Sequence, residues 1–356
     1  MKRPPSIFFS CPPLSPQEET RLRAVANETA VDVIAHSRLH GGPIHWTPHG
    51  TEANVKIFKG YDVRHHHRDA ALETEIYLGL IEVKAHMEEI AAVFADQNGA
   101  DAIDMAHLYT IEERTHRGTS VHVSWRGYKS FLPGVIRRRD VCLVDIADGF
   151  VTKDGRRGFV SAQRSVELPC CPELDPSLGY TRQVTLGSGL VALESSQRGT
   201  LYISYLLQLP GAYSGLAEHI VQAFKQDIVL KDKTARRRLL DALLPIRQRL
   251  FEAHLSRTPI LNAMQLVPHE ARYQCYLCLK PFGLFRRKTS CFKCGEVFCS
   301  KCTEPWRVQV GDRLRLVPIC KFCVQAPSDV DVDDQLDQEC SELEWAGASL
   351  ETLVCF

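Results

Sequence analysis

The sequence lacks any apolar run long enough to cross a membrane. A spanning helix needs about 20 consecutive apolar residues, and the runs here are far shorter. The N-terminal stretch MKRPPSIFFSCPPLSP has only Ile7 to Phe9 as an apolar run, which is too short for the apolar region of a secretory signal. We therefore expect a chain of the reducing cytosol, where paired cysteines bind metal more often than they form disulfides.

A net charge is also missing, because 43 Lys and Arg residues balance 43 Asp and Glu residues. With 24% charged and 44% hydrophobic residues, the composition is that of a globular protein and gives no global bias toward nucleic acid or acidic lipid. A chain of 356 residues is too long for one small domain, so we expect one large domain with a sizeable core and a smaller satellite.

Signatures of catalysis are absent as well. The chain contains no Gly-x-Ser-x-Gly elbow, no phosphate-binding loop and no dinucleotide fingerprint. The run of His65, His66 and His67 invites a metal interpretation, but consecutive residues of an extended segment do not readily converge on one ion. A solvated loop is the expectation there, and we expect a protein without enzymatic activity.

Cysteine pairs are what the sequence has in abundance. Residues 275–302 read CYLCLKPFGLFRRKTSCFKCGEVFCSKC, and CKFC follows at 320–323, so eight of the 14 cysteines form four Cys-x-x-Cys pairs. Each pair in a tight turn directs two thiolates at one ion, and tetrahedral zinc takes four, so two pairs make one site. A segment this short buries too little apolar surface to fold alone, so the metal supplies folding energy.

The gaps between the pairs are twelve, four and seventeen residues. The gap of four is too short for the second and third pairs to fold back on one ion, which favours an interleaved arrangement of two zinc ions. The first and third pairs then hold one zinc, and the second and fourth pairs hold the other. The predicted ligands are Cys275, Cys278, Cys299 and Cys302 for the first ion, and Cys291, Cys294, Cys320 and Cys323 for the second.

The spacing, together with RRKTSCFKCG, VFCSKC and PICKFC, resembles a FYVE domain over residues 272–325. The resemblance implies a two-zinc cross-brace that recognises phosphatidylinositol 3-phosphate on endosomal membranes through a basic motif and an apolar loop that enters the bilayer. On the matching positions it implies headgroup contacts from Arg286, Arg287, Lys288 and Lys293, and membrane insertion by Leu284 and Phe285. This chain departs from the motif at Thr289, Ser290 and Phe292, where the family has two histidines and an arginine.

Local charge favours a membrane contact. Between Arg272 and Cys323 there are eleven Lys or Arg residues against three acids. Each basic residue near an anionic leaflet contributes about 1 kcal/mol of attraction, which salt weakens. The alternative is that Phe282 and Phe285 pack the small zinc core and that the cations form a solvated face.

Other classes of zinc module compete for the same cysteines. A RING-type ubiquitin ligase also uses a cross-brace but usually has a histidine ligand, and the spacing with Gly295 after the fourth cysteine favours the FYVE-like scaffold. A nucleic-acid-binding finger tolerates positive charge, but the chain has no Cys2His2 spacing and no evident recognition helix, so we expect no nucleic-acid partner. A protein-interaction scaffold without specific lipid binding stays open as a further alternative.

Residues 15–257 alternate between helical and strand periodicities. They predict an opening amphipathic helix over SPQEETRLRAVANETAVDVIAHSR, an inserted helix over 85–96, and a long closing helix capped by Ser214. Pro245 is expected to kink or end that helix, with a further helical piece to about Leu255. The apolar face of the closing helix is predicted from residues that recur every four positions, namely Leu216, Ile220, Phe224 and Ile228. The predicted strands are Val55–Lys59, Glu75–Val83, His107–Glu112, Ser120–Tyr128, Val141–Ala147, Gly158–Leu168, Arg182–Leu193 and Thr200–Leu209.

Several blocks in this region resemble those of a START-related lipid-binding domain. They are RRRDVCLVDI (137–146), RSVELPCCP (164–172), TRQVTLGSGLVAL (181–193) and QLPGAYSGLAEHIVQAF (208–224), with Trp46 ahead of VKIFKG. The resemblance implies an α+β fold of the helix-grip type, in which a curved antiparallel sheet and a long C-terminal helix enclose a cavity for one lipid or sterol. Alternate strand residues point inward whether they bind a ligand or fill a core, so the lining of the cavity cannot be assigned.

Two smaller features are given structural interpretations. Arg137, Arg138, Arg139 and Asp140 could form a basic patch, but the START-like resemblance implies that the Arg-Asp pair opens a strand and forms a structural ion pair. Cys170 and Cys171 stand before Pro172 and are expected to be small buried thiols in a turn.

The expected organisation has five parts. They are a flexible N-terminus (1–14), a START-like domain (15–257), a linker (258–271), a FYVE-like zinc finger (272–325) and an acidic tail without regular structure (326–356). Residues 324–356 hold nine acids and no positive charge, which is typical of a partner-binding segment or a mask over the basic zinc module, with Leu343, Trp345 and Leu350 as short helical anchors. We expect a cytoplasmic, non-enzymatic adaptor that docks peripherally on anionic or phosphatidylinositol 3-phosphate membranes of endosomes.

Overall fold

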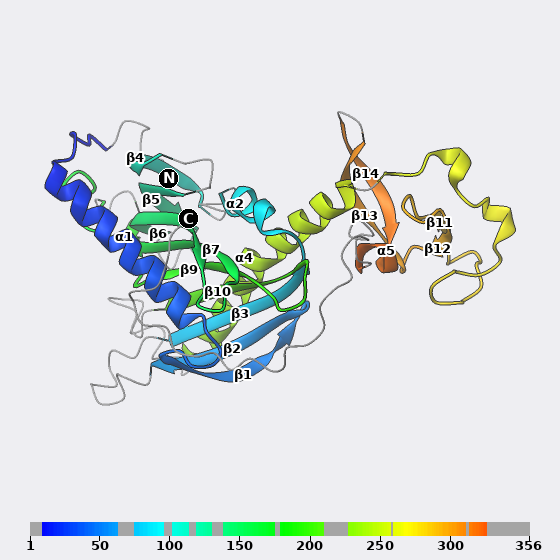
Figure 1. The fold of residues 1–356 in the computed structure, drawn as a ribbon, viewed down its shortest axis with the longest axis horizontal. Helices are drawn as coiled ribbons and strands as arrows, with labels where there is room; N and C mark the ends of the chain where they lie inside the picture. Colours follow the sequence, from blue (N-terminus) through cyan, green and yellow to red (C-terminus); the bar gives the residue numbers. More distant parts are fainter. Residues whose placement is uncertain are drawn as a thin grey trace. The chain divides into compact units, whose positions relative to one another are not determined.

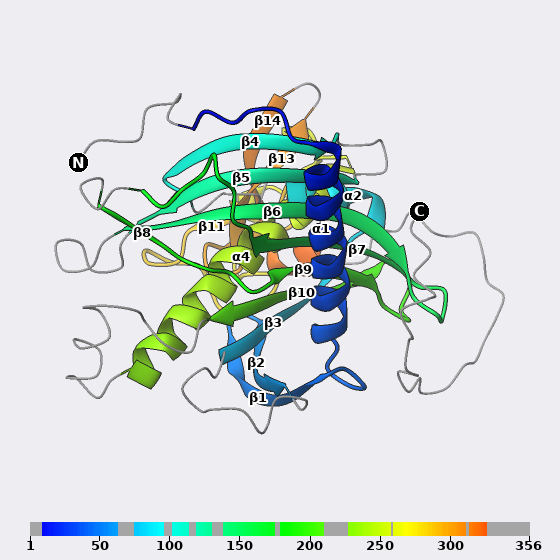
Figure 2. The ribbon, with the colours of Figure 1, turned by 90° about the vertical axis from the view of Figure 1, so that its left-hand side faces the viewer.

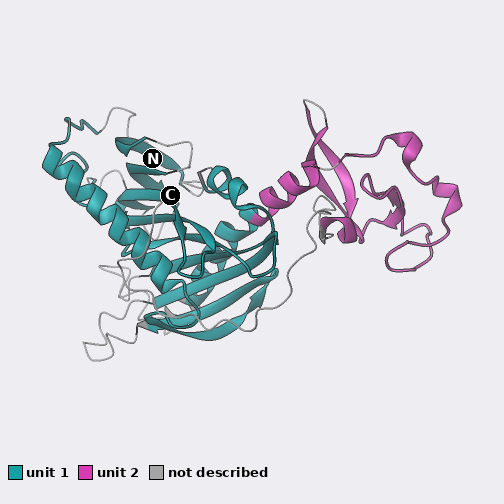
Figure 3. Ribbon diagram, in the orientation of Figure 1, with its two compact units in different colours: residues 1–246, 343–356 teal, residues 247–342 magenta. Residues whose placement is uncertain are grey.

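The computed structural model describes residues 9–62, 75–95, 102–113, 119–129, 138–174, 179–209, 227–257, 259–310 and 313–325. The described residues up to Ile246 form one compact unit, and those from Arg247 onward form a second (Figure 3). None of the helices described is long and apolar enough to span a bilayer.

The first unit opens with helix α1, Pro16–His36. Its start is fixed by a capping box, because the Ser15 side chain accepts a hydrogen bond from the Glu18 amide and the Glu18 carboxylate accepts one from the Ser15 amide. The buried face of the helix is Leu22, Ala26, Thr29, Ala30 and Val33. The opening amphipathic helix is therefore confirmed.

A ten-stranded sheet forms the body of the first unit (Figure 1). Its strands are β1 (Ile44–Glu52), β2 (Val55–Asp62), β3 (Glu75–Lys84), β4 (Asp104–Glu112), β5 (Ser120–Tyr128), β6 (Arg138–Val151), β7 (Arg157–Ser165), β8 (Tyr180–Arg182), β9 (Ser188–Glu194) and β10 (Thr200–Leu209). The order is β1-β2-β3-β10-β9-β7-β6-β5-β4, with every pairing along that path antiparallel, and short β8 pairs with β6 in parallel.

Helices cover both faces of this sheet, and strand alternation shows which face each one covers. In β3, Ile76 and Leu78 join the core cluster that contains the buried residues of α1, which crosses the strands in Figure 2. Gly79, which points the other way, lies against helix α4 (Asp227–Arg257), since a Cβ atom there would come 2.7 Å from Leu243 Cδ1. The large antiparallel sheet followed by a long helix, as predicted, is confirmed.

Helix α2 (Met87–Ala95) packs on the α4 side of the sheet. Phe94 of this helix lies edge-on to Phe159 of β7, with ring centroids 6.0 Å apart. Val160, the next residue of β7, belongs instead to the α1 cluster. The face covered by α2 and α4 is called the α4 face below.

Some boundaries differ from those predicted from the sequence. The segment 182–193 is not one strand, because β8 ends at Arg182 and β9 begins at Ser188 after Gly187, whose φ is +149°. Pro245 does not end the closing helix, and α4 continues to Arg257. Buried Leu243, Ile246 and Leu250 flank the proline, so packing outweighs the one backbone hydrogen bond that a proline removes.

The second unit contains two small hairpins and the last turns of α4. Its strands are β11 (Lys288–Ser290), β12 (Val297–Cys299), β13 (Thr303–Val310) and β14 (Arg313–Cys320), followed by helix α5 (Lys321–Gln325). β11 pairs with β12 and β13 pairs with β14. Two short 3-10 turns, Ala263–Gln265 and His269–Ala271, precede them.

The end of α4 is part of the core of the second unit. Leu255 is 2% exposed and belongs to the same cluster as the cysteines. The Ser256 hydroxyl accepts a hydrogen bond from the Gln309 amide at 3.0 Å. Beyond the helix, the amides of Leu261 and Val267 donate to the carbonyls of Phe292 and Gly295, each at 2.9 Å.

Candidate zinc and membrane-contact site

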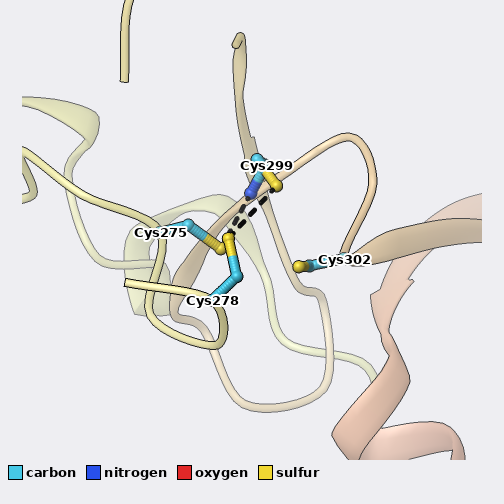
Figure 4. A group of neighbouring side chains, drawn as sticks. All are labelled: Cys275, Cys278, Cys299 and Cys302. Atoms are coloured by element: carbon cyan, nitrogen blue, oxygen red, sulfur yellow. Dashed lines mark hydrogen bonds between the residues drawn. The ribbon is translucent and has the colours of Figure 1, made fainter. Parts of the chain in front are cut away.

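The first and third cysteine pairs lie together in the second unit. The sulfur atoms of Cys275, Cys278, Cys299 and Cys302 all lie within 4.8 Å of one another (Figure 4). Cys299 ends β12 and Cys302 directly precedes β13, so the strand ends position one pair against the loop that carries the other. The amide of Cys299 donates to the sulfur of Cys275 at 3.3 Å.

The second and fourth pairs form a matching group of Cys291, Cys294, Cys320 and Cys323, again within 4.8 Å. Cys291 follows β11, Cys320 ends β14 and Cys323 lies in α5. The sulfur of Cys291 accepts hydrogen bonds from the amides of Lys293 at 3.4 Å and Cys320 at 3.3 Å. The interleaved cross-brace is therefore present as expected.

A common backbone turn shapes the first two pairs. The amide of Leu279 donates to the carbonyl of Cys275, and the amide of Gly295 donates to the carbonyl of Cys291, both at 2.9 Å. Leu279 and Gly295 both have left-handed φ angles, +55° and +77°. A glycine adopts this conformation without steric cost, which explains the Cys-x-x-Cys-Gly sequence of the second pair.

Both groups fit zinc. A zinc–sulfur bond of about 2.3 Å in a tetrahedron places the sulfurs roughly 3.8 Å apart. The Cys278–Cys299 and Cys294–Cys320 sulfur distances are 3.9 and 4.0 Å. Burial raises the pKa of the Cys275 thiol, but backbone amide donors led by Cys278 outweigh it and lower that pKa to about 6, which favours the thiolate that zinc requires. The chain therefore has two zinc sites.

The turn between the first two pairs ends in an exposed apolar tip. Gly283 and Arg286 exchange backbone hydrogen bonds of 2.9 and 3.3 Å, so the two residues between them project from the turn. Leu284 is 94% exposed and Phe285 is fully exposed. Phe282 packs against the zinc core, as the alternative interpretation of this loop proposed, but Phe285 does not. Leu284 and Phe285 are called the apolar tip below.

The predicted headgroup cations stand in different environments. Arg287 is exposed, and Arg286 donates to the carbonyl of Pro281 at 3.3 Å. Lys288 lies over the ring of Phe282 and donates to the carbonyl of His269 at 2.7 Å. Lys293 lies beyond Cys291 and is half-buried.

Sequence reasoning missed His269. Its Nε2 lies 2.9 Å from the hydroxyl of Ser290, one of the two positions where the family motif has histidine. The histidine comes from the short turn before the first cysteine, 21 positions away in the sequence, so no local pattern places it at β11.

A second feature that sequence reasoning missed is a buried ion pair on the α4 face of the sheet. Arg126 and Asp145 approach to 2.7 Å with side chains only 5% and 8% exposed. Ser124 donates to Asp145, and Arg126 donates to Gln163, both at 2.9 Å. Within the described part of the chain, Arg126 Nε has no hydrogen-bond partner. The sequence held one signal for this ion pair. Polar and apolar residues alternate in SVHVSWRGY, which puts the polar side chains of β5 on one face of the sheet.

Asp140 forms a buried ion pair at 2.9 Å, as expected of a structural residue, but the partner is Arg182 of β8, which the sequence did not indicate. Cys171 is buried, but Cys170 is only partly buried and its sulfur lies beside that of Cys11.

Other predicted features lie outside the described residues. These are His65, His66 and His67, Arg137, the start of the closing helix with Ser214, Leu216, Ile220 and Phe224, and the acidic tail with Leu343, Trp345 and Leu350.

Comparison with solved structures finds similarity in the first part of the chain. Human StAR-related lipid transfer protein 5 has a TM-score of 0.46 and 15% identity over 66% of this chain and 99% of that chain. Human STARD10 has a TM-score of 0.37 and 15% identity over 69% of this chain and 86% of that chain.

Curated relatives match the cysteine-rich part. Protein FREE1 of Arabidopsis thaliana is 39% identical over 59 residues, 16% of this chain and 10% of its own length. A putative 1-phosphatidylinositol 3-phosphate 5-kinase of Drosophila melanogaster is 37% identical over 60 residues, 16% of this chain and 3% of its own length. The yeast (Saccharomyces cerevisiae) 1-phosphatidylinositol 3-phosphate 5-kinase FAB1 is 32% identical over 85 residues, 24% of this chain and 4% of its own length.

The match therefore covers a tenth or less of these relatives. Residues 265–329 also match the family model of the FYVE zinc finger. That range contains all eight cysteines of the two zinc sites. The chain thus carries a FYVE zinc finger, braced by two interleaved four-cysteine sites, after a large antiparallel sheet with a long helix.

Proposed function

We propose that this chain is a non-enzymatic adaptor whose zinc finger docks on anionic membranes that contain phosphatidylinositol 3-phosphate. The observation that carries the proposal is the apolar tip, because Leu284 and Phe285 are almost wholly exposed while Arg286 and Arg287 follow directly. Two large apolar side chains exposed at one turn and followed by cations make a surface that an anionic bilayer would bury.

The energies involved suit a reversible anchor. Burying a Leu or Phe side chain contributes about 1.5–3 kcal/mol each, and each cation near an anionic leaflet contributes about 1 kcal/mol. Insertion of the apolar tip brings Arg286, Arg287 and Lys288 to the headgroup level at the same place. Part of this binding energy offsets the translational and rotational entropy lost on binding, so docking is reversible. The contribution of the cations weakens as the salt concentration rises.

The choice of headgroup rests on the family and on local chemistry. Two relatives of the zinc finger are named as kinases of phosphatidylinositol 3-phosphate, and we extend that lipid to this chain as a proposal. Arg286, Arg287, Lys288 and Lys293 supply positive charge at the motif positions. His269, beside Lys288 and Ser290, offers an imidazole near the place where the family motif has its own. Location on endosomal membranes follows from the same lipid.

The first unit is proposed to hold a lipid or sterol between the sheet and α4. Support comes from the Arg126–Asp145 pair. The buried Arg126 guanidinium, whose Nε has no hydrogen-bond partner among the described residues, offers a polar contact on the α4 face to an otherwise apolar guest. Native mass spectrometry of the intact chain tests this proposal. A copurifying mass that lipid extraction removes would support it, and an adduct-free chain that takes up no lipid from vesicles would count against it.

A protein-interaction scaffold is the second candidate, and one observation favours it. Leu314 and Leu316, on the outer face of β14, are 69% and 66% exposed although they are remote in sequence from the apolar tip. These leucines offer a second apolar contact that a partner protein would cover. A ubiquitin ligase is the less favoured candidate. Such an enzyme would discharge ubiquitin from a charged conjugating enzyme, and a discharge assay tests this directly.

Liposome flotation of the zinc-loaded chain separates these candidates. Vesicles of phosphatidylcholine are doped with phosphatidylinositol 3-phosphate or, at equal total charge, with phosphatidylserine. The proposal expects tighter binding to the first set, and a loss of more than about tenfold in Leu284→Ala/Phe285→Ala, because two large apolar contacts disappear. Leu314→Ala/Leu316→Ala is the matched control and is expected to bind like the parent chain.

Equal binding to both vesicle types would remove headgroup specificity and leave a purely electrostatic anchor. Absence of binding to either type would favour the scaffold. Zinc content measured on the same samples ensures that a variant has not simply lost its fold.

A further inference from the structure

Two cysteines outside the zinc sites bring their thiols together across the first unit. The sulfur atoms of Cys11 and Cys170 lie 2.6 Å apart, although the residues are 159 positions apart in the sequence. Both are free cysteines, and both are partly exposed. Contact between sulfurs from such distant segments needs each segment to be held in place.

Cys170 is held by the loop that follows β7. Arg182 donates to the carbonyl of Pro172 at 2.8 Å and to that of Cys171 at 3.1 Å. The same guanidinium pairs with Asp140, which is completely buried and also accepts a hydrogen bond from Trp125 at 2.8 Å. The loop is therefore fastened to the core directly after Cys170.

Cys11 is held by its own neighbours. The ring of Phe9 packs on Trp125 with centroids 5.3 Å apart. The carbonyl of Pro12 accepts a hydrogen bond from the Tyr109 hydroxyl at 2.7 Å. That hydroxyl also lies 3.4 Å from the sulfur of Cys170, so one tyrosine of β4 contacts both segments. Residues 9–14, called the N-terminal strap below, are thus laid across the edge of the sheet.

We propose that Cys11 and Cys170 form a reversible disulfide, which makes them a redox-controlled clasp that fastens the N-terminal strap to the loop after β7. A disulfide needs both sulfurs delivered to one place without backbone movement, and the two sets of contacts do this in the reduced chain. Nearby Cys142 and Cys171 are each 1% exposed, so a soluble oxidant reaches the clasp before it reaches them.

The oxidant is a low-molecular-weight disulfide such as glutathione disulfide. The Cys170 thiolate attacks one glutathione sulfur, forms a mixed disulfide and releases a glutathione thiolate, which takes up the proton that Cys170 lost. Cys11 then attacks the Cys170 sulfur and releases the second glutathione, which leaves with the Cys11 proton. Two protein thiols are oxidised and one glutathione disulfide is reduced to two glutathione molecules, and excess glutathione reverses the exchange.

Local acidity supports this order of attack. Burial, and a hydrogen bond with Cys170, raise the pKa of the Cys11 thiol to about 12. Cys11 therefore stays protonated at neutral pH in the reduced chain, which leaves the first attack to Cys170. The resolving attack needs the Cys11 thiolate, which forms more readily once glutathione caps Cys170, because the Cys170 thiol helps to raise the Cys11 pKa. Closing the clasp joins chain segments far apart in the sequence, and long closed loops restrict the unfolded chain most.

The experiment equilibrates the full, zinc-loaded chain in a series of reduced and oxidised glutathione mixtures. After acid quenching and alkylation, a non-reducing peptide map identifies each cross-link, and zinc content is measured in parallel. The proposal expects one intramolecular cross-link, between the Cys11 and Cys170 peptides, while both zinc ions stay bound. The oxidised chain is also expected to unfold at a higher temperature than the reduced chain.

Cys11→Ser and Cys170→Ser are each expected to abolish both the cross-link and the thermal shift. Cys340→Ser and Cys355→Ser are matched controls, expected to keep both. The proposal is overturned if no cross-link forms at any glutathione ratio, or if Cys170 pairs with a cysteine other than Cys11. It is equally overturned if the thermal shift persists in the Cys11→Ser chain.

Discussion

The ring of Phe251, near the end of α4, lies edge-on to that of Trp306 in β13, with centroids 5.7 Å apart and planes at 68°. The zinc finger therefore uses the last turns of the preceding long helix as part of its own core, together with buried Leu255. A folding unit that begins after the helix lacks these contacts.

We predict that a fragment beginning at residue 247 folds and retains zinc, whereas one beginning at 258 loses zinc more readily to a chelator. Within the full chain, Leu255→Ala is expected to destabilise the zinc finger by about 2–5 kcal/mol, because it leaves a cavity beside the cysteines. Met264→Ala, at a position 93% exposed, is the control and is expected to have little effect. Zinc release followed with a colorimetric chelator measures both comparisons, and equal release from the two fragments would refute the prediction.

The membrane proposal predicts a specific loss for one cation. Arg287 is exposed beside the apolar tip, so Arg287→Ala is expected to weaken binding to anionic vesicles by about 1 kcal/mol, or roughly fivefold, at low salt. Raising the salt concentration should shrink the difference between variant and parent. Arg237→Ala removes an exposed cation of α4 in the first unit and serves as the charge-matched control. A similar loss in both variants would mean that overall charge, rather than this position, governs binding.

The buried ion pair of the first unit predicts asymmetric mutant effects. Asp145→Ala strands the Arg126 charge in the interior and is expected to cost about 3–5 kcal/mol of stability. Replacing both partners, as in Arg126→Met/Asp145→Leu, is expected to recover most of that loss, because no charge is then left unpaired. Denaturant unfolding measures the stabilities of the three chains. A double variant as unstable as the single one would show that the pair itself, and not charge compensation, supports the fold.

The contact between α4 and β1 predicts an acid sensitivity. The Asp232 carboxylate accepts a hydrogen bond from Arg236 Nε at 2.9 Å, and it lies 2.5 Å from His49 Nε2. Burial raises the pKa of Asp232, but the bonds from Arg236 and His49 outweigh it, so the folded pKa lies below the ordinary value of about 3.9.

The lowered pKa of Asp232 determines how the stability of the fold changes with pH. The stability contributed by the Asp232 carboxylate is fully present above its unfolded pKa and is lost as pH falls through the folded one. Asp232→Asn should therefore lower stability at neutral pH and flatten its decline between about pH 5 and pH 3. Thermal melts across that range measure both effects, and Asp241→Asn, at an exposed position of the same helix, is the control. Parallel pH profiles for Asp232→Asn and the parent chain would contradict the prediction.

The zinc sites and the strand pattern could be read from the sequence because both depend on short-range information. Cysteine spacing restricts which pairs can share an ion, and alternation such as that of Thr200 to Leu209 fixes the two faces of a strand. The contacts that were missed join distant segments. Cys11 meets Cys170 only because the chain folds back over β4, and His269 reaches Ser290 across the first cysteine pair.

Helix α4 illustrates the other limit of sequence reasoning. A proline weakens a helix locally, and the sequence shows this cost. The sequence does not show the packing contacts that offset it. Buried residues on both sides of Pro245, from Leu243 to Leu250, hold the helix through the proline. Tertiary packing of this kind depends on partners that the local sequence does not contain.

The most direct test of the account is the number of zinc ions per chain, measured by elemental analysis and native mass spectrometry of the purified protein. The account predicts two ions in the folded chain, with one lost selectively in Cys275→Ser and the other in Cys291→Ser, since these residues belong to different four-cysteine groups. A folded chain that contains no zinc or a single ion would contradict it, and so would two variants that lose the same ion.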